Sequence, residues 1–328
     1  MKISIIIPVY NSSLTLKECL GAVFHSNKKN FETIIVSDNS PDDSVSIAKK
    51  YNCKIIELPE NKGPAFARNT GAKAATGDIL LFIDSDVIIK NTALNYISDL
   101  FLEKTVDAIQ GIYSHEPTYK SIATQYQMSY NCYYIWPKNK KYASTMSTCC
   151  FSIRREIFKK LGGFNTNIKR ASAEDEEFGY LLIDKGYKIL ISREINVEHR
   201  VNYNTKYFIK KKFYTYIDVM KEYLRNKTYV KKIKQKNYST VLAGIVVLGL
   251  IIISATVSII FLNKAAFSLF LILNIIFFLL HVRFIKFISH AKGLTKALSA
   301  MLICYIDTFL MLLGLLFGTF GYFIGKKY

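Results

Sequence analysis

The feature that most constrains this chain is an apolar run without a single charged residue over residues 239–262. A helix needs about 20 residues to cross the hydrocarbon core of a bilayer, so this run is long enough. Only helices and closed barrels satisfy their backbone groups in lipid, which predicts a helix here. Two further apolar runs follow, at 265–282 and at 299–324, the second interrupted by Asp307. We therefore predict a transmembrane region of two or three helices over residues 239–328.

A strongly basic segment lies directly before the first apolar run. Residues 200–237 hold twelve Lys and Arg against two Asp and Glu, a surplus that is over half of the chain's formal charge of +19. No stacking-aromatic module or helix-turn-helix pattern accompanies it, so we predict no nucleic-acid partner. We expect residues 201–238 to form a basic, aromatic juxtamembrane segment attracted to anionic lipid.

The basic residues also predict an orientation. Five lysines at 227–236 precede the first run, and four basic residues at 283–296 follow the second. By the positive-inside rule both of these ends face the cytosol. A third crossing would leave Lys326 and Lys327 outside, against that rule. Asp307 is expected at a helix interface or facing water, with a lipid headgroup contact as the alternative.

The cysteines indicate a reducing compartment for the first part of the chain. They have no metal-ligand spacing and no CxxC pair, which is typical of reduced thiols. The start of the chain lacks the pattern of a secretory signal peptide. We therefore predict a multi-pass protein of the cell membrane whose N-terminal domain is cytoplasmic. The cysteines are Cys19, Cys53, Cys132, Cys149, Cys150 and Cys304.

Before residue 200 the sequence alternates between strand and helix patterns. Such alternation predicts an α/β fold, a Rossmann-like mostly parallel sheet flanked by helices. Runs rich in Ile and Val predict strands, and amphipathic or Ala-rich runs predict the helices between them. The expected strands cover residues 3–9, 31–37, 54–58 and 78–83, and the expected helices cover 12–25, 42–51 and 64–75.

Polar clusters follow three of the predicted strands. Ligands of such sheets bind beyond the carboxyl ends of the strands. We therefore expect the three clusters to line one ligand site. They are Pro8-Val9-Tyr10-Asn11, Asp38-Asn39-Ser40 and Asp84-Ser85-Asp86.

Six ordered sequence blocks within about residues 3–200 resemble the family 2 glycosyltransferases, which have the GT-A fold. The resemblance implies a catalytic domain over residues 1–200 that takes a sugar from a nucleotide-sugar donor. A UDP-sugar is favoured. The blocks are IIIPVYN, VSDNSPDDS, NKGPAFARNTGAKAATGD, FIDSDV, RREIFKKLGGF and SAEDEEFGYLL.

For the donor diphosphate, the resemblance implies a divalent cation, Mg²⁺ or Mn²⁺, that stabilises the charge of the leaving group. Asp86 is the expected metal ligand, since hard oxygen ligands suit these ions. Asp84 would face the ribose or assist the metal. The alternative for Asp84 and Asp86 is a pair of solvated carboxylates in a turn, with no ligand. His199 is either a further metal or phosphate contact or a structural histidine.

The resemblance also implies the remaining donor contacts. Asp38 would accept a hydrogen bond from the base, and helix capping with Ser40 is the alternative. Gly63 permits close approach of the backbone. Arg68 would reach the diphosphate, or else be an exposed helix residue. The residues expected to line the base and ribose pocket are Pro8, Tyr10 and Asn11, and Ser85 is a further expected nucleotide-sugar contact.

The acceptor side is expected in the later blocks. Inverting transfer to a hydroxyl needs a base within hydrogen-bond reach of the attacking oxygen. By the resemblance Asp175 is that base, with the neighbouring Glu174 as the other choice. Four acids opening a helix also stabilise its positive end without any catalytic role. Residues 147–153 predict a strand, and Gly162-Gly163 are expected to end a helix beneath the acceptor site.

The departures from the family narrow the expected reaction. The chain lacks a QxxRW-type motif, which favours transfer of one sugar over processive synthesis. The Glu-Asp pair favours a hydroxyl acceptor on a lipid-linked or membrane-associated glycan, as in cell-envelope polysaccharide synthesis. Residues 203–223 would frame that acceptor at the membrane, or only anchor the chain. The alternatives are a polyprenyl-phosphate glycosyl synthase and a non-enzymatic, degenerate GT-A membrane scaffold.

Overall fold

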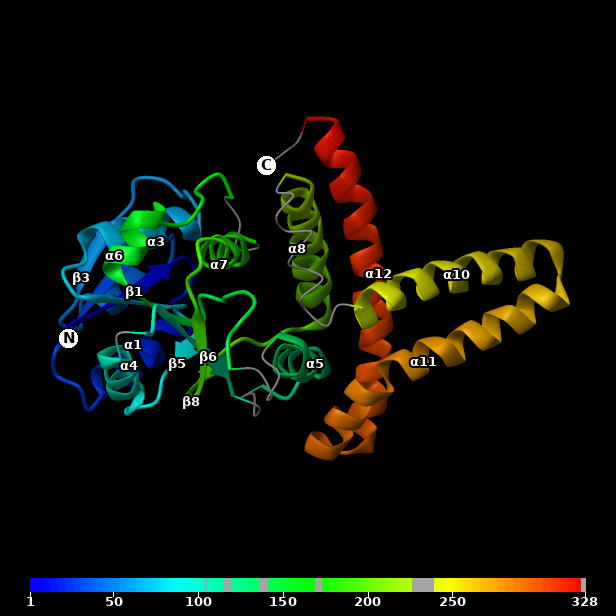
Figure 1. Ribbon diagram of the computed structural model, residues 1–328, viewed down its shortest axis with the longest axis horizontal. Coiled ribbons are helices and arrows are strands. Elements are labelled where there is room, and N and C mark those ends of the chain that lie inside the picture. Colours follow the sequence, from blue (N-terminus) through cyan, green and yellow to red (C-terminus); the bar gives the residue numbers. More distant parts are fainter. Residues whose placement is uncertain (104, 115–118, 136–140, 169–172, 226–238, 326–328) are drawn as a thin grey trace. The chain divides into compact units, whose positions relative to one another are not determined.

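A computed structural model describes residues 1–103, 105–114, 119–135, 141–168, 173–225 and 239–325 (Figure 1). The chain divides into two compact units. Unit 1 contains Met1–Tyr119 and Ile135–Asn202, and unit 2 contains Lys120–Tyr134 and Tyr203–Tyr328. Unit 2 therefore takes a short piece from the middle of the sequence, which no pattern in the sequence had marked.

Unit 1 is built on one sheet with the strand order β3-β2-β1-β4-β7-β6-β8-β5. The first four strands in this order are parallel to one another, as the Ile- and Val-rich runs predict. The strands are β1 (Ile3–Val9), β2 (Phe31–Ser37), β3 (Lys54–Glu57), β4 (Ile79–Ile83), β5 (Val87–Ile88), β6 (Ala108–Tyr113), β7 (Cys150–Arg154) and β8 (Ile189–His199).

The second half of the sheet is mixed. Strand β7 runs antiparallel to both β4 and β6, and β5 runs antiparallel to the end of β8. Strands β6 and β8 are parallel. The α/β prediction of a mostly parallel sheet flanked by helices is confirmed, with β7 and β5 as the antiparallel members. The predicted strand at 147–153 begins later, at Cys150, because the preceding residues form a loop.

Six described helices belong to unit 1. Helix α3 packs on β1 and β2, and α6 follows β7 directly and ends at Gly162, as predicted. The core of unit 1 lies between these helices and the sheet, where β4 is buried along its whole length. The helices are α1 (Leu16–Phe24), α2 (Ser44–Ala48), α3 (Pro64–Ala74), α4 (Ala93–Leu102), α6 (Arg155–Leu161) and α7 (Glu174–Asp184).

Unit 2 is helical. Three of its helices are long and apolar enough to cross a membrane, in agreement with the three predicted runs. Helix α10 packs with α11, and α8 packs along α12. The helices are α5 (Ile122–Tyr130) with the π-helix η1 (Asn131–Ile135), α8 (Thr205–Arg225), α10 (Ser239–Phe261), α11 (Lys264–Lys292) and α12 (Leu294–Phe323). The lysines at 227–236 and 326–327 lie outside the described residues.

Asp307 lies in the middle of α12 and is completely buried. Its carboxylate accepts hydrogen bonds from the hydroxyls of Tyr126 (3.0 Å) on α5 and Tyr216 (2.7 Å) on α8. The Lys212 ammonium of α8 lies 3.6 Å away. The helix-interface interpretation of Asp307 is therefore confirmed, and the headgroup alternative is not, because its oxygens face tyrosines and a lysine of the same unit.

All six cysteines are free thiols, and five of them are buried. Burial raises the pKa of the Cys150 thiol to about 12. A thiol with such a pKa is protonated and a poor nucleophile at neutral pH, which is in keeping with the predicted reduced thiols.

Candidate active site

The three polar clusters meet at one edge of the sheet in unit 1. Strands β1, β2 and β4 are parallel, so their carboxyl ends lie together. The Asn11 backbone N–H donates to the Ser40 hydroxyl (2.9 Å), which joins the ends of β1 and β2. The hydroxyls of Ser12 and Ser85 lie 2.7 Å apart, which joins the ends of β1 and β4. Tyr10 is exposed at this edge.

Asp38 is buried and holds the loop that precedes α3. Its carboxylate oxygens accept the backbone N–H groups of Lys62 (2.7 Å) and Gly63 (2.8 Å). Gly63 has φ +88°, which favours glycine because a Cβ would be strained there. The capping alternative for Asp38 is wrong, since Ser40 donates instead to Asp42 (2.7 Å). Asp38 thus fixes a backbone turn at the edge where the donor is predicted to bind.

Asp86 and His199 meet although 113 positions separate them in the sequence. The short strand β5 follows Asp86 and pairs with the end of β8, where Val87 opposes His199. The Arg200 backbone N–H donates to the Asp86 carbonyl (2.7 Å) and fixes this register. The result is a distance of 3.3 Å from the His199 Nε2 to the Asp86 carboxylate.

This carboxylate and imidazole form a donor set that fits a divalent cation shared with a diphosphate. Mg²⁺ and Mn²⁺ sites of this kind use one or two protein ligands and complete their coordination with phosphate oxygens and water. Within the described ranges no group of three or more His, Cys, Asp or Glu side chains is placed to hold a metal ion. The His199 ring is oriented by stacking on Tyr113, with ring centroids 4.8 Å apart.

Arg68 is 3% exposed, so the alternative of an exposed helix residue is wrong. One of its terminal nitrogens lies 2.8 Å from the Asp84 carboxylate, and the other lies 2.9 Å from Glu174. Asp84 belongs to the predicted donor cluster and Glu174 opens α7, which carries the predicted base. Arg68 therefore ties these two parts of the site together. Its predicted contact with the diphosphate stays a prediction.

Replacing Arg68 with methionine is expected to lower the free energy of unfolding by about 3–5 kcal/mol, because it leaves Glu174 buried without its cation. Lys73→Met is the matched control, since Lys73 lies on the same helix α3 but is exposed. We expect the control to change the stability by no more than about 0.5 kcal/mol. Urea denaturation of the two variants measures this difference. Equal stabilities would show that the Arg68 pairs contribute nothing.

Asp175 lies next to Glu174 in the first turn of α7, beside the loop that precedes β7. Its carboxylate accepts the Glu176 N–H (2.8 Å) and is 3.4 Å from the Thr148 backbone N–H. Gln110 of β6 fixes that loop, because its side chain accepts the Ser147 N–H (2.7 Å) and donates to the Ser147 carbonyl (3.1 Å). Sequence reasoning missed Gln110, whose only signal is a polar residue within an otherwise apolar strand.

Burial raises the pKa of the Asp175 carboxyl well above its usual range. The negative charges of Glu174 and Glu176 raise it further, and the Arg68 cation acts in the opposite direction. A carboxylate with a raised pKa is a stronger base. Glu174 is the poorer choice for this role, since it is 2% exposed and paired with Arg68.

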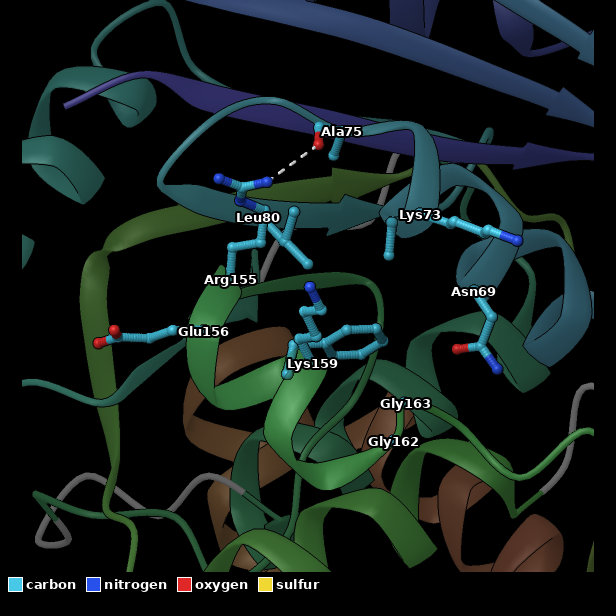
Figure 2. A pocket seen from close by; sticks show the side chains of 11 residues that line it. Asn69, Lys73, Ala75, Leu80, Arg155, Glu156, Lys159, Gly162 and Gly163 are labelled. Carbon is cyan, nitrogen blue, oxygen red and sulfur yellow. Dashed lines mark hydrogen bonds between the residues drawn. The ribbon is translucent and has the colours of Figure 1, made fainter.

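A separate pocket of about 590 Å³ lies between α3 and α6 (Figure 2). Lys73, Arg155 and Lys159 line it, and Arg155 donates to the Ala75 carbonyl at 3.4 Å. Leu80, near the start of β4, also lines it, whereas the polar clusters follow the strand ends. None of the predicted site residues lines this pocket, so it is distinct from the predicted donor site.

Comparison with known families supports the interpretation of unit 1. The model of the family described as "Glycosyl transferase family 2" matches residues 4–162. The chain is 38% identical over 124 residues to the poly(ribitol-phosphate) beta-glucosyltransferase of Bacillus spizizenii, which covers 34% of this chain and 20% of that protein. The chain spans about half or less of the length of the first curated relatives that it matches.

Two solved structures share the fold over nearly the whole chain. The mannosyltransferase PcManGT of Pyrobaculum calidifontis, in complex with GDP-Man and Mn²⁺, has a TM-score of 0.58 and 15% identity, covering 100% of this chain and 88% of that one. S. aureus TarS 1–349, in complex with UDP-GlcNAc, has a TM-score of 0.54 and 17% identity, covering 99% and 92%. Residues 4–162 thus match glycosyl transferase family 2 within an N-terminal unit of the GT-A fold, and three helices of membrane-like character follow.

Proposed function

We propose that this protein is a membrane-bound, metal-dependent inverting glycosyltransferase that moves one sugar from a nucleotide-sugar to a hydroxyl. The acceptor hydroxyl belongs to a lipid-linked or membrane-associated glycan of the cell envelope. The observation that carries the proposal is the Asp86–His199 pair, 3.3 Å apart at the edge of the sheet where the polar clusters meet. This pair could hold a divalent cation, and such a cation stabilises a diphosphate leaving group.

On the donor side, Asp86 and His199 would hold Mg²⁺ or Mn²⁺. The bound ion would stabilise the negative charge that develops on the leaving diphosphate. Asp38 would accept a hydrogen bond from an N–H of the base, which favours uracil, and Gly63 would permit close approach of the backbone. PcManGT and TarS, which share the fold, bind GDP-Man with Mn²⁺ and UDP-GlcNAc respectively, which supports a nucleotide-sugar donor. The further donor contacts of this proposal are Pro8, Tyr10, Asn11, Arg68, Asp84 and Ser85.

On the acceptor side, Asp175 would take the proton of the attacking hydroxyl. The hydroxyl oxygen forms a bond to the anomeric carbon, and the bond from that carbon to the diphosphate oxygen breaks. The configuration of the sugar is thereby inverted. Arg68 would keep Asp175 in place through Glu174, because Arg68 also holds Asp84 at the donor edge.

The cell membrane is the proposed location, with unit 1 on the cytoplasmic side and at least two crossings. Three apolar helices support the attachment. Anionic lipid is the proposed partner of the basic residues of α8, of which Lys206 and Lys210 are exposed. No nucleic acid is expected to bind.

Thermal denaturation of the full-length protein in detergent tests the donor half of the proposal. We expect UDP-sugars with Mn²⁺ to raise the melting temperature, and to do so less when EDTA is present. GDP-sugars serve as the comparison. Transfer of a radiolabelled sugar is then measured to a lipid-linked sugar and to a polyprenyl phosphate. Transfer only to the phosphate would overturn the hydroxyl acceptor in favour of a polyprenyl-phosphate synthase.

The rate of transfer should fall at low pH, because Asp175 acts only when its carboxylate is deprotonated. The raised pKa of Asp175 moves this loss to a higher pH than an ordinary carboxyl would show. The turnover rate measured against pH should therefore be full above that raised pKa. Below it the rate should drop about tenfold per pH unit.

Glu176→Gln provides a sharp control for this assignment. The Glu176 charge raises the pKa of Asp175, so its removal should shift the acidic limb to lower pH. The control is Glu103→Gln, which removes a carboxylate just after α4. We expect no shift of the acidic limb in this variant. If the acidic limb of the pH–rate profile did not move in Glu176→Gln, the group that titrates in that limb would not be Asp175.

A further inference from the structure

Helix α12 has two opposite faces of different character. At roughly 100° per residue, most of its large exposed apolar side chains fall on one face of the helix, and Leu315 and Phe317 lie to either side of it. We call this set the apolar stripe. The opposite face is buried and carries Asp307, Gly314 and Gly318. The apolar stripe consists of Leu298, Leu302, Phe309, Leu316, Phe320 and Phe323.

Helix α8 covers the buried face of α12 at close range. A Cβ placed on Gly318 would lie 2.7 Å from the Cβ of Met220, and Gly314 has no room for one against Tyr216. Tyr216 and Lys212 also reach the Asp307 carboxylate. The two helices are therefore fixed side by side along the second half of α12 (Figure 1).

This pairing places charged groups beside the middle of α12. Lys212 of α8 lies next to Asp307, and the adjacent Lys210 is exposed. If α12 crossed the bilayer at its midpoint, these lysines would enter the hydrocarbon core, which strongly disfavours charged side chains. The charged residues of α8 are Lys206, Lys210, Lys211, Lys212, Asp218, Lys221, Glu222 and Arg225.

Helix α11 contacts α12 on the side of the apolar stripe. Tyr305, which shares the face of the stripe, stacks on Phe277 of α11 with ring centroids 4.1 Å apart and donates to Asn274 (3.0 Å). Figure 1 shows α10 and α11 leaving the α8–α12 pair sideways. In the most apolar 18-residue stretch of each helix, 22% of α10 and 17% of α11 is buried, against 44% of α12. Helices that cross so steeply do not all run along the bilayer normal.

We propose that α12 lies in the membrane interface and that only α10 and α11 cross the bilayer. The apolar stripe would enter the acyl region, with α8 on the aqueous side of α12. An interfacial helix of this kind is buried by about 5–10 Å. This places the end of the chain on the same side of the membrane as α8. The Lys326 and Lys327 charges then agree with the positive-inside rule, which a third crossing would violate. The proposal requires membrane attachment but does not depend on the proposed reaction.

Spin labels on the apolar stripe measure its depth in the bilayer. The full-length Cys53→Ser protein is a suitable background, because the other five cysteines are buried. Single cysteines replace Leu298, Leu302, Phe309, Leu316 and Phe323 in turn, and oxygen and nickel-chelate accessibilities give each depth in proteoliposomes. We expect all five labels at one shallow depth. A profile that deepens towards Phe309 and becomes shallow again, across about 30 Å of hydrocarbon, would overturn the proposal.

Labelling from one side of the membrane tests the same proposal independently. Lys327→Cys reports the end of the chain, Lys210→Cys reports α8, and Lys264→Cys reports the turn between α10 and α11. Each variant is treated with an impermeant maleimide in sealed vesicles, before and after permeabilisation. We expect Lys327→Cys and Lys210→Cys to be labelled from the same side of the sealed vesicle, and Lys264→Cys from the opposite side. Labelling together with Lys264→Cys would show that α12 crosses.

Discussion

Asp86→Ala is expected to remove metal-dependent donor binding and to lower the transfer rate on the order of 10³-fold. The estimate corresponds to about 4 kcal/mol of lost charge stabilisation on the leaving diphosphate. Alanine removes the carboxylate that lies 3.3 Å from the His199 Nε2, so only the imidazole remains as a donor. Titration of UDP with and without Mn²⁺, followed by a transfer assay, measures both effects.

The matched control for Asp86→Ala is Asp99→Ala, which removes an exposed carboxylate from α4. We expect it to keep the Mn²⁺-dependent part of UDP binding. If Asp86→Ala bound UDP with the same dependence on Mn²⁺ as the control, the assignment of Asp86 and His199 as the metal site would be wrong. Circular dichroism spectra of the two variants check that both remain folded.

Asp175→Asn is expected to lower the transfer rate by about 10²–10⁴-fold, because asparagine cannot take the acceptor proton. Donor affinity should stay within about twofold, since Asp175 touches the loop at Thr148 and not the donor edge. The amide still fits the space of the carboxyl. Single-turnover transfer and UDP-sugar titration separate the two quantities.

Glu177→Gln is the neighbouring control for Asp175→Asn. Glu177 also lies in the first turn of α7, but its carboxylate accepts a hydrogen bond from Asn165 (3.0 Å) and is not the proposed base. We expect transfer by this variant to remain within a few-fold of the unchanged protein. Loss of UDP-sugar binding in Asp175→Asn, with transfer preserved per bound donor, would contradict the role of base.

The sequence predicted the parallel part of the sheet well. Strands β1 to β4 each contain a run of Ile, Val, Leu or Phe, as a parallel strand of such a sheet requires, although β1 to β3 also include polar residues or Pro8. Their bounds differ from the predicted ones by at most one residue. The meeting of the three polar clusters followed from this arrangement, because the carboxyl ends of parallel strands share one edge.

Other parts of the site were beyond the reach of sequence patterns. Arg68 and Glu174 are 106 positions apart, and their ion pair depends on where α7 packs. Nothing in an Ala-rich helix indicates that its arginine is buried. Strand β7 has an ordinary strand pattern, and its antiparallel direction follows only from the path of the chain between β6 and α6. Likewise, the short β5 carries too few residues to be predicted.

The two ion pairs of Arg68 have a consequence for protein engineering. Chimeric glycosyltransferases are made by exchanging the acceptor half of one enzyme for that of another. In this chain such an exchange, with a junction after Leu161, would separate Arg68 from Glu174. A graft without an acidic residue at position 174 would leave the buried Arg68 guanidinium with only one of its two ion pairs. Compatible partners for recombination are therefore enzymes that carry both the arginine and the acidic residue of this ion pair. Candidates would be screened for these two residues before they are ranked by overall sequence identity.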